Sequence, residues 1–97
     1  MFARFSIIHT GIDKVDEAAE LFEESVVPAF KLQKGYNAAY FINERHTGKS
    51  ICISIWDSEE DALKNEESHL YQEQLVKFMS FFTEPPYREG YDVLVEG

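Results

Sequence analysis

The sequence is poor in cysteine, in basic residues and in long apolar runs, and each shortage excludes a class of protein. Its 97 residues include one Cys, so an intramolecular disulfide framework and a cysteine zinc site are both excluded. Nine Lys and Arg stand against 18 Asp and Glu, a net charge of −9, which argues against binding to nucleic acid or anionic lipid. No apolar run approaches the roughly 20 residues of a membrane-spanning helix. We therefore expect a cytoplasmic protein with no nucleic-acid or membrane partner.

Apolar residues make up 44% of the chain and aromatic residues 14%, which is enough for one small core. We expect a single domain over residues 1–97. The spacing of apolar residues then predicts the elements. The expected strands are 3–10, 37–43, 50–56 and 91–96, and the expected helical regions are 13–33, kinked near Pro28, and a second that begins at the cap Ser58 and divides near Ser68.

The predicted order of elements, β-α-β-β-α-β, is typical of the α+β ferredoxin-like fold, with one antiparallel sheet and the helices on one face. Neither face of the predicted strand 50–56 is typical of a solvent-exposed face: Ile51, Ile53 and Ile55 alternate with Cys52, Ser54 and Trp56. Helices cover only one face, so the other needs an apolar cover of its own. For a chain this short, a second copy is the economical cover. The sequence therefore predicts a homodimer packed sheet to sheet.

Four short motifs lie in order within residues 25–62, namely Val27-Pro28-Ala29, Gly35-Tyr36, Thr47-Gly48-Lys49 and Ile55-Trp56-Asp57-Ser58. In this order they resemble the antibiotic biosynthesis monooxygenase (ABM) domain family of the dimeric α+β barrel superfamily. The resemblance covers nearly the whole chain in element order, and about forty residues in its motifs. It implies a dimeric α+β barrel with a small-molecule pocket between the sheet and the helices.

The family resemblance also implies a choice of activities. Some members oxygenate aromatic polyketides without metal or flavin, others degrade haem, and many have no known reaction. The haem-degrading branch uses an Asn in the first strand and a Trp and a His on the second helix. This chain has an Ile and a His at the first position, Asn65 or Glu66 near the second, and Leu75 or Val76 near the third. We therefore do not expect haem degradation.

Cofactor-free oxygenation needs a base that deprotonates an electron-rich phenol or quinol, in a pocket that excludes water. A His with a pKa near neutrality is the natural base, and His9 is the candidate if its face of the strand turns toward the helices. The alternative is a strand-edge His with a structural or solvated role.

Other residues are candidates for the wall of the pocket, although packing in the core is an alternative role for most of them. These pocket candidates are Tyr40, Trp56, His69, Tyr71 and Phe78. One Glu-x-x-His pair, Glu66 and His69, is present, but a di-iron bundle needs two such pairs, so we expect no metal. No cofactor is expected either.

Two functions stay open from the sequence. The first is an ABM-like monooxygenase or related small-molecule enzyme that acts on an aromatic or quinone-like substrate without a tightly bound cofactor. The second is a non-catalytic homodimer of the same fold that binds a small ligand or has a structural role. A base and polar partners converging on one cavity would favour the first.

Overall fold

The computed structural model describes residues 1–44 and 46–97. Arg45, in the expected hairpin connection 44–49, lies outside the described residues. The strands are β1 (Phe2–His9), β2 (Tyr36–Asn43), β3 (Lys49–Trp56) and β4 (Tyr87–Asp92). The α-helices are α1 (Val15–Leu21), α2 (Val27–Lys31), α3 (Glu59–Glu67) and α4 (His69–Phe78).

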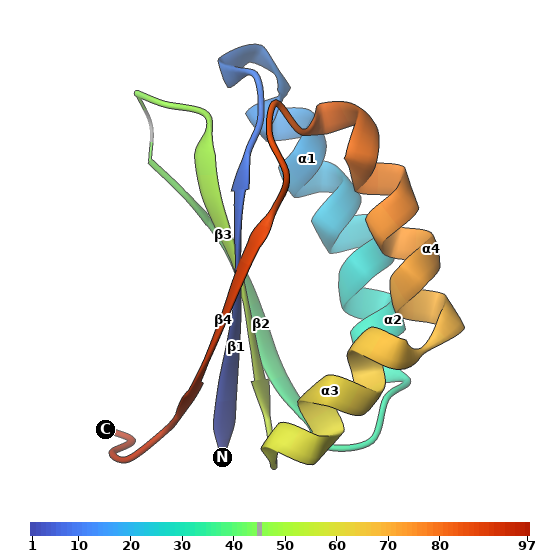
Figure 1. Ribbon diagram of the computed structural model, residues 1–97, viewed down its shortest axis with the longest axis vertical. Helices are drawn as coiled ribbons and strands as arrows, with labels where there is room; N and C mark the ends of the chain where they lie inside the picture. The colour runs from blue at the N-terminus through green and yellow to red at the C-terminus, as the bar shows by residue number, and fades with distance from the viewer. Residues whose placement is uncertain (45) are drawn as a thin grey trace.

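The four strands form one antiparallel sheet in the order β2-β3-β1-β4. Ser6 in the middle of β1 lies opposite Cys52 on one side and Arg88 on the other, which fixes the register of the central strands. All the helices lie on one side of this sheet, and the two chain termini lie near the same end of it (Figure 1). The predicted α+β ferredoxin-like arrangement is confirmed.

The first helical region is continuous but widened in its middle. A turn of π-helix, Phe22–Val26, joins α1 to α2, and Pro28 stands in the first turn of α2. Proline has no N–H to donate and its ring crowds the preceding turn, so the helix widens just before it. The kink or break expected near residues 25–27 takes the form of this π-helical turn, without a break in the helix. Through it the helix keeps both Phe22 and Phe30 buried against the sheet.

The second helical region divides at Ser68, as expected. The Ser58 hydroxyl caps α3 by accepting from the Asp61 N–H at 3.2 Å. Ser68 serves both helices: its hydroxyl donates to the Asn65 carbonyl at 2.7 Å and accepts from the Tyr71 N–H at 3.1 Å. This hydroxyl therefore links the end of α3 to the start of α4.

Replacing Ser68 with alanine is expected to lower the free energy of unfolding by about 1 kcal/mol, the usual cost of losing an N-cap hydroxyl. Urea denaturation followed by far-UV circular dichroism measures the change. Ser80→Ala is the matched control, because Ser80 is exposed and forms none of the side-chain hydrogen bonds found among the described residues. Equal stability of the two variants would show that Ser68 contributes no capping energy.

The last strand lies four residues earlier than the sequence predicted. The expected strand was 91–96, whereas β4 spans Tyr87–Asp92 and pairs with β1 from Ile7↔Tyr87 to Phe2↔Asp92. The polar run Arg88-Glu89-Gly90 concealed it, because a strand at the sheet edge does not need an apolar sequence. At Gly90 a side chain would come within 2.5 Å of the Phe2 ring, so glycine lets β4 pass close over that ring.

Side chains alternate between the two faces of the sheet. In β1, Phe2, Arg4, Ser6 and Ile8 face the helices, so Ala3, Phe5, Ile7 and His9 face the other way. We call this second side the open face. Pairing across the sheet adds to the open face Ala38, Tyr40, Ile42, Ile51, Ile53, Ile55, Tyr87, Glu89 and Tyr91.

Candidate functional site

A cavity of about 70 Å³ lies between the sheet and the helices. Because about 10–15 Å³ is enough for one water, it has room for several waters or for one ring of a ligand in their place. Its wall is largely aromatic. The aromatic lining residues are Phe22, Phe30, Trp56, Tyr71, Phe78 and Phe82. Such a wall repels water and offers ring faces and edges to a flat ligand.

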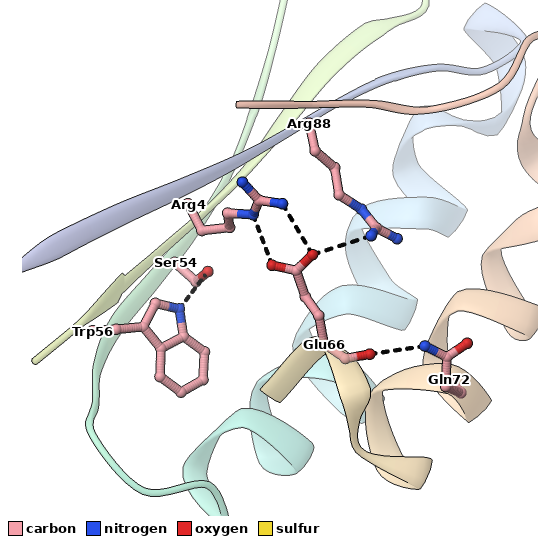
Figure 2. Close-up of polar contacts among 6 residues, drawn as sticks. All are labelled: Arg4, Ser54, Trp56, Glu66, Gln72 and Arg88. Carbon is pink, nitrogen blue, oxygen red and sulfur yellow. Dashed lines mark hydrogen bonds and ion pairs between the residues drawn. The ribbon is translucent and has the colours of Figure 1, made fainter. Parts of the chain in front are cut away.

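Trp56, at the end of β3, forms the rigid part of this wall. It is fully buried. The centroid of its ring lies 5.7 Å from that of Phe30 and 5.8 Å from that of Tyr36, and both contacts are edge-to-face. The indole Nε1–H donates to the Ser54 hydroxyl at 2.8 Å, two residues earlier on the same face (Figure 2). This hydrogen bond satisfies the one polar group of the indole and fixes the ring.

An ion cluster of two arginines and one glutamate lies at the polar side of the cavity. Glu66 on α3 accepts two hydrogen bonds from Arg4 of β1, from Nε at 2.7 Å and from Nη2 at 3.1 Å. Arg88 of β4 donates a third from Nη1 at 3.1 Å, so both guanidiniums converge on one carboxylate (Figure 2). The Glu66 side chain is only 12% exposed. The cluster ties α3 to two neighbouring strands.

A hydrogen bond across the α3–α4 junction holds the backbone of Glu66. Gln72 of α4 donates from Nε2 to the Glu66 backbone carbonyl at 2.8 Å (Figure 2). This bond closes the turn around Ser68 and keeps Glu66 directed toward the sheet.

Tyr71 brings a phenol next to the ion cluster. The Arg88 guanidinium lies over its ring, 5.4 Å from the centroid, in a cation–π contact. Burial raises the pKa of the Tyr71 hydroxyl, and the positive charge of Arg88 lowers it by a smaller amount. The net shift is upward, so Tyr71 is a protonated phenol at neutral pH and can donate a hydrogen bond into the cavity.

Two further polar residues of the lining, Cys52 and Gln74, are not candidates for a base or a nucleophile. Burial raises the pKa of the Cys52 thiol to about 12, so Cys52 stays protonated and is no nucleophile at neutral pH. Gln74 accepts a hydrogen bond from the Ser25 hydroxyl at 2.5 Å, and Lys77 donates to the same hydroxyl at 2.8 Å. These bonds join α4 to the first helical region on the helical side of the cavity.

Three of the residues expected at the site line the cavity together. Trp56, Tyr71 and Phe78 come from β3 and from two turns of α4, and all three contribute to its wall.

The other three expected residues lie elsewhere. His9 is on the open face, where its Nδ1 is 3.0 Å from Glu84 Oε1. Tyr40 is 56% exposed on the same face, and His69 is exposed at the start of α4. The condition attached to His9, that its side of the strand turn toward the helices, is not met, because Ser6 and Ile8 occupy that side. Its role as a base stays a prediction to which this cavity gives no support.

Sequence reasoning did not find the arginines of the ion cluster. One signal was available: Arg4 shares the period-two alternation of Ser6 and Ile8, and a charge on the buried side of a strand needs a partner. No sequence pattern indicated that Arg88 pairs with Glu66, because the strand that carries Arg88 was expected four residues later.

No protein-family model matches the chain, and no curated protein sequence matches it. Solved structures do match. A protein from Bordetella bronchiseptica named for antibiotic biosynthesis monooxygenase superimposes with a TM-score of 0.85 at 12% identity, with 97% of each chain covered. The chain has the ABM fold. This fold was the one implied by the four sequence motifs.

Two further solved structures share this fold. One is named antibiotic biosynthesis monooxygenase, with a TM-score of 0.78 at 10% identity, covering 98% of this chain and 100% of that one. The other is a variant of SnoaB, named as a cofactor-independent oxygenase from Streptomyces nogalater. Its TM-score is 0.78 at 12% identity, covering 98% of this chain and 95% of that one.

Among the described residues, none of the helices has the length and apolar character that crossing a membrane requires. The same residues contain no cluster of three His, Cys, Asp or Glu side chains suited to a metal ion. Glu66 and His69, the Glu-x-x-His pair, differ in setting: the carboxylate meets Arg4 and Arg88, while the imidazole is exposed.

Proposed function

We propose that this chain belongs to the ABM domain family and is a cofactor-independent monooxygenase of an electron-rich aromatic or quinone-like substrate. The observation that carries the proposal is the aromatic cavity with a carboxylate, Glu66, and a protonated phenol, Tyr71, in its wall. The resemblance in fold to a structure named as a cofactor-independent oxygenase supports it.

With an anthrone as the substrate, the proposed reaction converts the methylene of the central ring into a carbonyl. A base removes a proton from the substrate, and the resulting anion gives one electron to O₂. The two radicals combine into a peroxide, which takes up a proton and then loses water, so CH₂ and O₂ become C=O and H₂O. The substrate is the reductant and O₂ the oxidant. The protein supplies a base, a proton donor and a cavity that excludes water.

Glu66 is our candidate for the base and Tyr71 for the proton donor. Both line the cavity, from helices on either side of Ser68. Arg4 and Arg88 orient the carboxylate through the three hydrogen bonds that it accepts. His9 stays the rival candidate proposed from the sequence, on the open face.

Glu66→Gln is expected to lower oxygen uptake with a panel of anthrones and hydroquinones by about 100-fold or more, because removal of a general base usually costs that much. The amide keeps the size of the side chain but cannot take the proton. An oxygen electrode with product analysis measures the rate.

Two control variants make the assignment specific. Glu67→Gln removes an equal charge from the next residue of α3, which is exposed and outside the cavity, and is expected to keep the wild-type rate. His9→Ala is expected to keep it as well. Loss of turnover in His9→Ala with retention in Glu66→Gln would reassign the base to His9.

One observation favours a non-catalytic function. The Glu66 carboxylate accepts three hydrogen bonds from two arginines, so both of its oxygens already contact donors of the protein. The second candidate function is therefore a small-ligand-binding or structural homodimer of the same fold. Absence of oxygen uptake across the whole panel would favour it.

We also propose that the chain forms a homodimer through its open face and that it acts in the cytoplasm. The open face carries Ile51, Ile53 and Ile55 in a row between Tyr40 on β2 and Phe5 on β1. An apolar sheet face of this kind is typical of a buried interface. The single Cys suits a reducing compartment.

A further inference from the structure

The cavity has a net positive charge inside a protein of net charge −9. Its charged lining residues are Arg4, Arg88 and Glu66, two positive and one negative. One guanidinium is therefore left without a compensating carboxylate among the lining residues. The 12% exposed Glu66 and the partly buried arginines are shielded from water, so the surplus charge acts strongly on whatever enters the cavity.

The two arginines differ in the number of N–H groups that they donate to Glu66. Arg4 uses two N–H groups in a bidentate contact with Glu66, the arrangement of a structural pair. Arg88 gives Glu66 only one of its five N–H groups, and Glu66 is its one hydrogen-bond acceptor among the described residues. The Tyr71 ring supports the guanidinium face at 5.4 Å, which leaves its edge for another acceptor. Arg88 is thus held in one orientation and keeps N–H donors that an anion can bind.

We infer that the ligand of this cavity is an aromatic carboxylate, whose ring lies against the aromatic wall and whose carboxylate binds Arg88. The inference rests on the proposal above that this cavity is the ligand site. To that proposal it adds that the ligand carries a negative charge and that Arg88 recognises this charge. Arg4 keeps Glu66 in place, and Glu66 holds Arg88 in position while repelling a second carboxylate from its own side.

The test compares benzoate with benzamide, two molecules of nearly equal shape that differ in charge. Trp56 is the only tryptophan and lines the cavity, so the single indole N–H signal in a ¹H–¹⁵N NMR spectrum reports occupancy. Benzoate is expected to bind at least tenfold more tightly than benzamide. Equal affinities, or no movement of the signal with either compound, would overturn the inference.

Variants with opposite expected effects sharpen the test. Arg88→Met is expected to weaken benzoate binding about tenfold while benzamide binding stays unchanged, because one charge-assisted contact is lost. The unchanged benzamide titration also shows that the cavity is intact. Glu66→Gln is expected to strengthen benzoate binding severalfold, because the competing negative charge is gone.

Lys31→Met is the matched control, since it removes one positive charge from an exposed position of α2 outside the cavity. An equal loss of benzoate affinity in Lys31→Met and Arg88→Met would mean that only the overall charge matters, and would overturn the role of Arg88. Binding and oxygen uptake are separate measurements. A preference for benzoate without oxygen uptake removes the oxygenase proposal alone, and turnover without that preference removes the carboxylate alone.

Discussion

Replacing Trp56 with alanine is expected to lower the free energy of unfolding by about 3–5 kcal/mol, the usual cost of truncating a large buried aromatic side chain. The indole is fully buried, packs against Phe30 and Tyr36, and donates a hydrogen bond to Ser54. Because domains of this size are stable by only about 5–15 kcal/mol, the loss is a large part of the total. Urea denaturation at one fixed protein concentration, followed by far-UV circular dichroism, measures it.

The conservative variant Trp56→Phe separates packing from hydrogen bonding. It keeps a ring in contact with Phe30 and loses the Nε1–H, so the Ser54 hydroxyl loses its donor. We expect roughly half of the alanine effect. A loss below about 1 kcal/mol in Trp56→Ala would show that the neighbouring rings collapse into the space and that Trp56 is no rigid wall of the cavity.

Introducing two charges on the open face is expected to convert the proposed homodimer into a monomer. The double variant is Tyr40→Asp/Ile42→Asp. In the single chain Tyr40 is 56% exposed and Ile42 is 47% exposed, so the fold of one chain tolerates both changes. In a sheet-to-sheet dimer the same carboxylates are buried without partners. A cost of about 3 kcal/mol or more corresponds to at least a 100-fold rise in the dissociation constant.

Light scattering at micromolar protein concentration distinguishes the two states. Val76→Asp is the matched control, because Val76 is 66% exposed on the outer side of α4, away from the sheet. It is expected to stay dimeric with the wild type. A wild-type chain that scatters as a monomer, or a doubly charged variant that stays dimeric, would contradict association through the open face.

Local chemistry made most of the fold predictable from the sequence. Pro28 predicts an irregularity in the first helical region and Ser58 predicts the start of the second, because capping and proline effects act within one turn. The polar stretch 64–69 interrupts the apolar stripe and predicts the division near Ser68. The strands with regular apolar alternation, β1 to β3, were predicted in place. β4 was misplaced, because its pairing with β1 comes from the register of a distant strand and not from its own residues.

The site divides in a similar way. Trp56, Tyr71 and Phe78 were predicted because large aromatic residues in strands and helices tend to be buried near one another. The hydrogen bonds of the ion cluster join Arg4 to Glu66 across 62 positions and Glu66 to Arg88 across 22. No local pattern encodes them.

By itself, the sequence determined the order of the elements, the divided helices, the two apolar faces of the sheet and the resemblance to the ABM domain family. The first three follow from interactions between residues a few positions apart or from the alternation of side chains along a strand, and the resemblance rests on four short motifs. Only the tertiary structure decided that His9 lies outside the cavity and which charges meet in it. His9 faces away while Arg4, Arg88 and Glu66 face inward, because strand register and helix position are set by packing across the whole sheet.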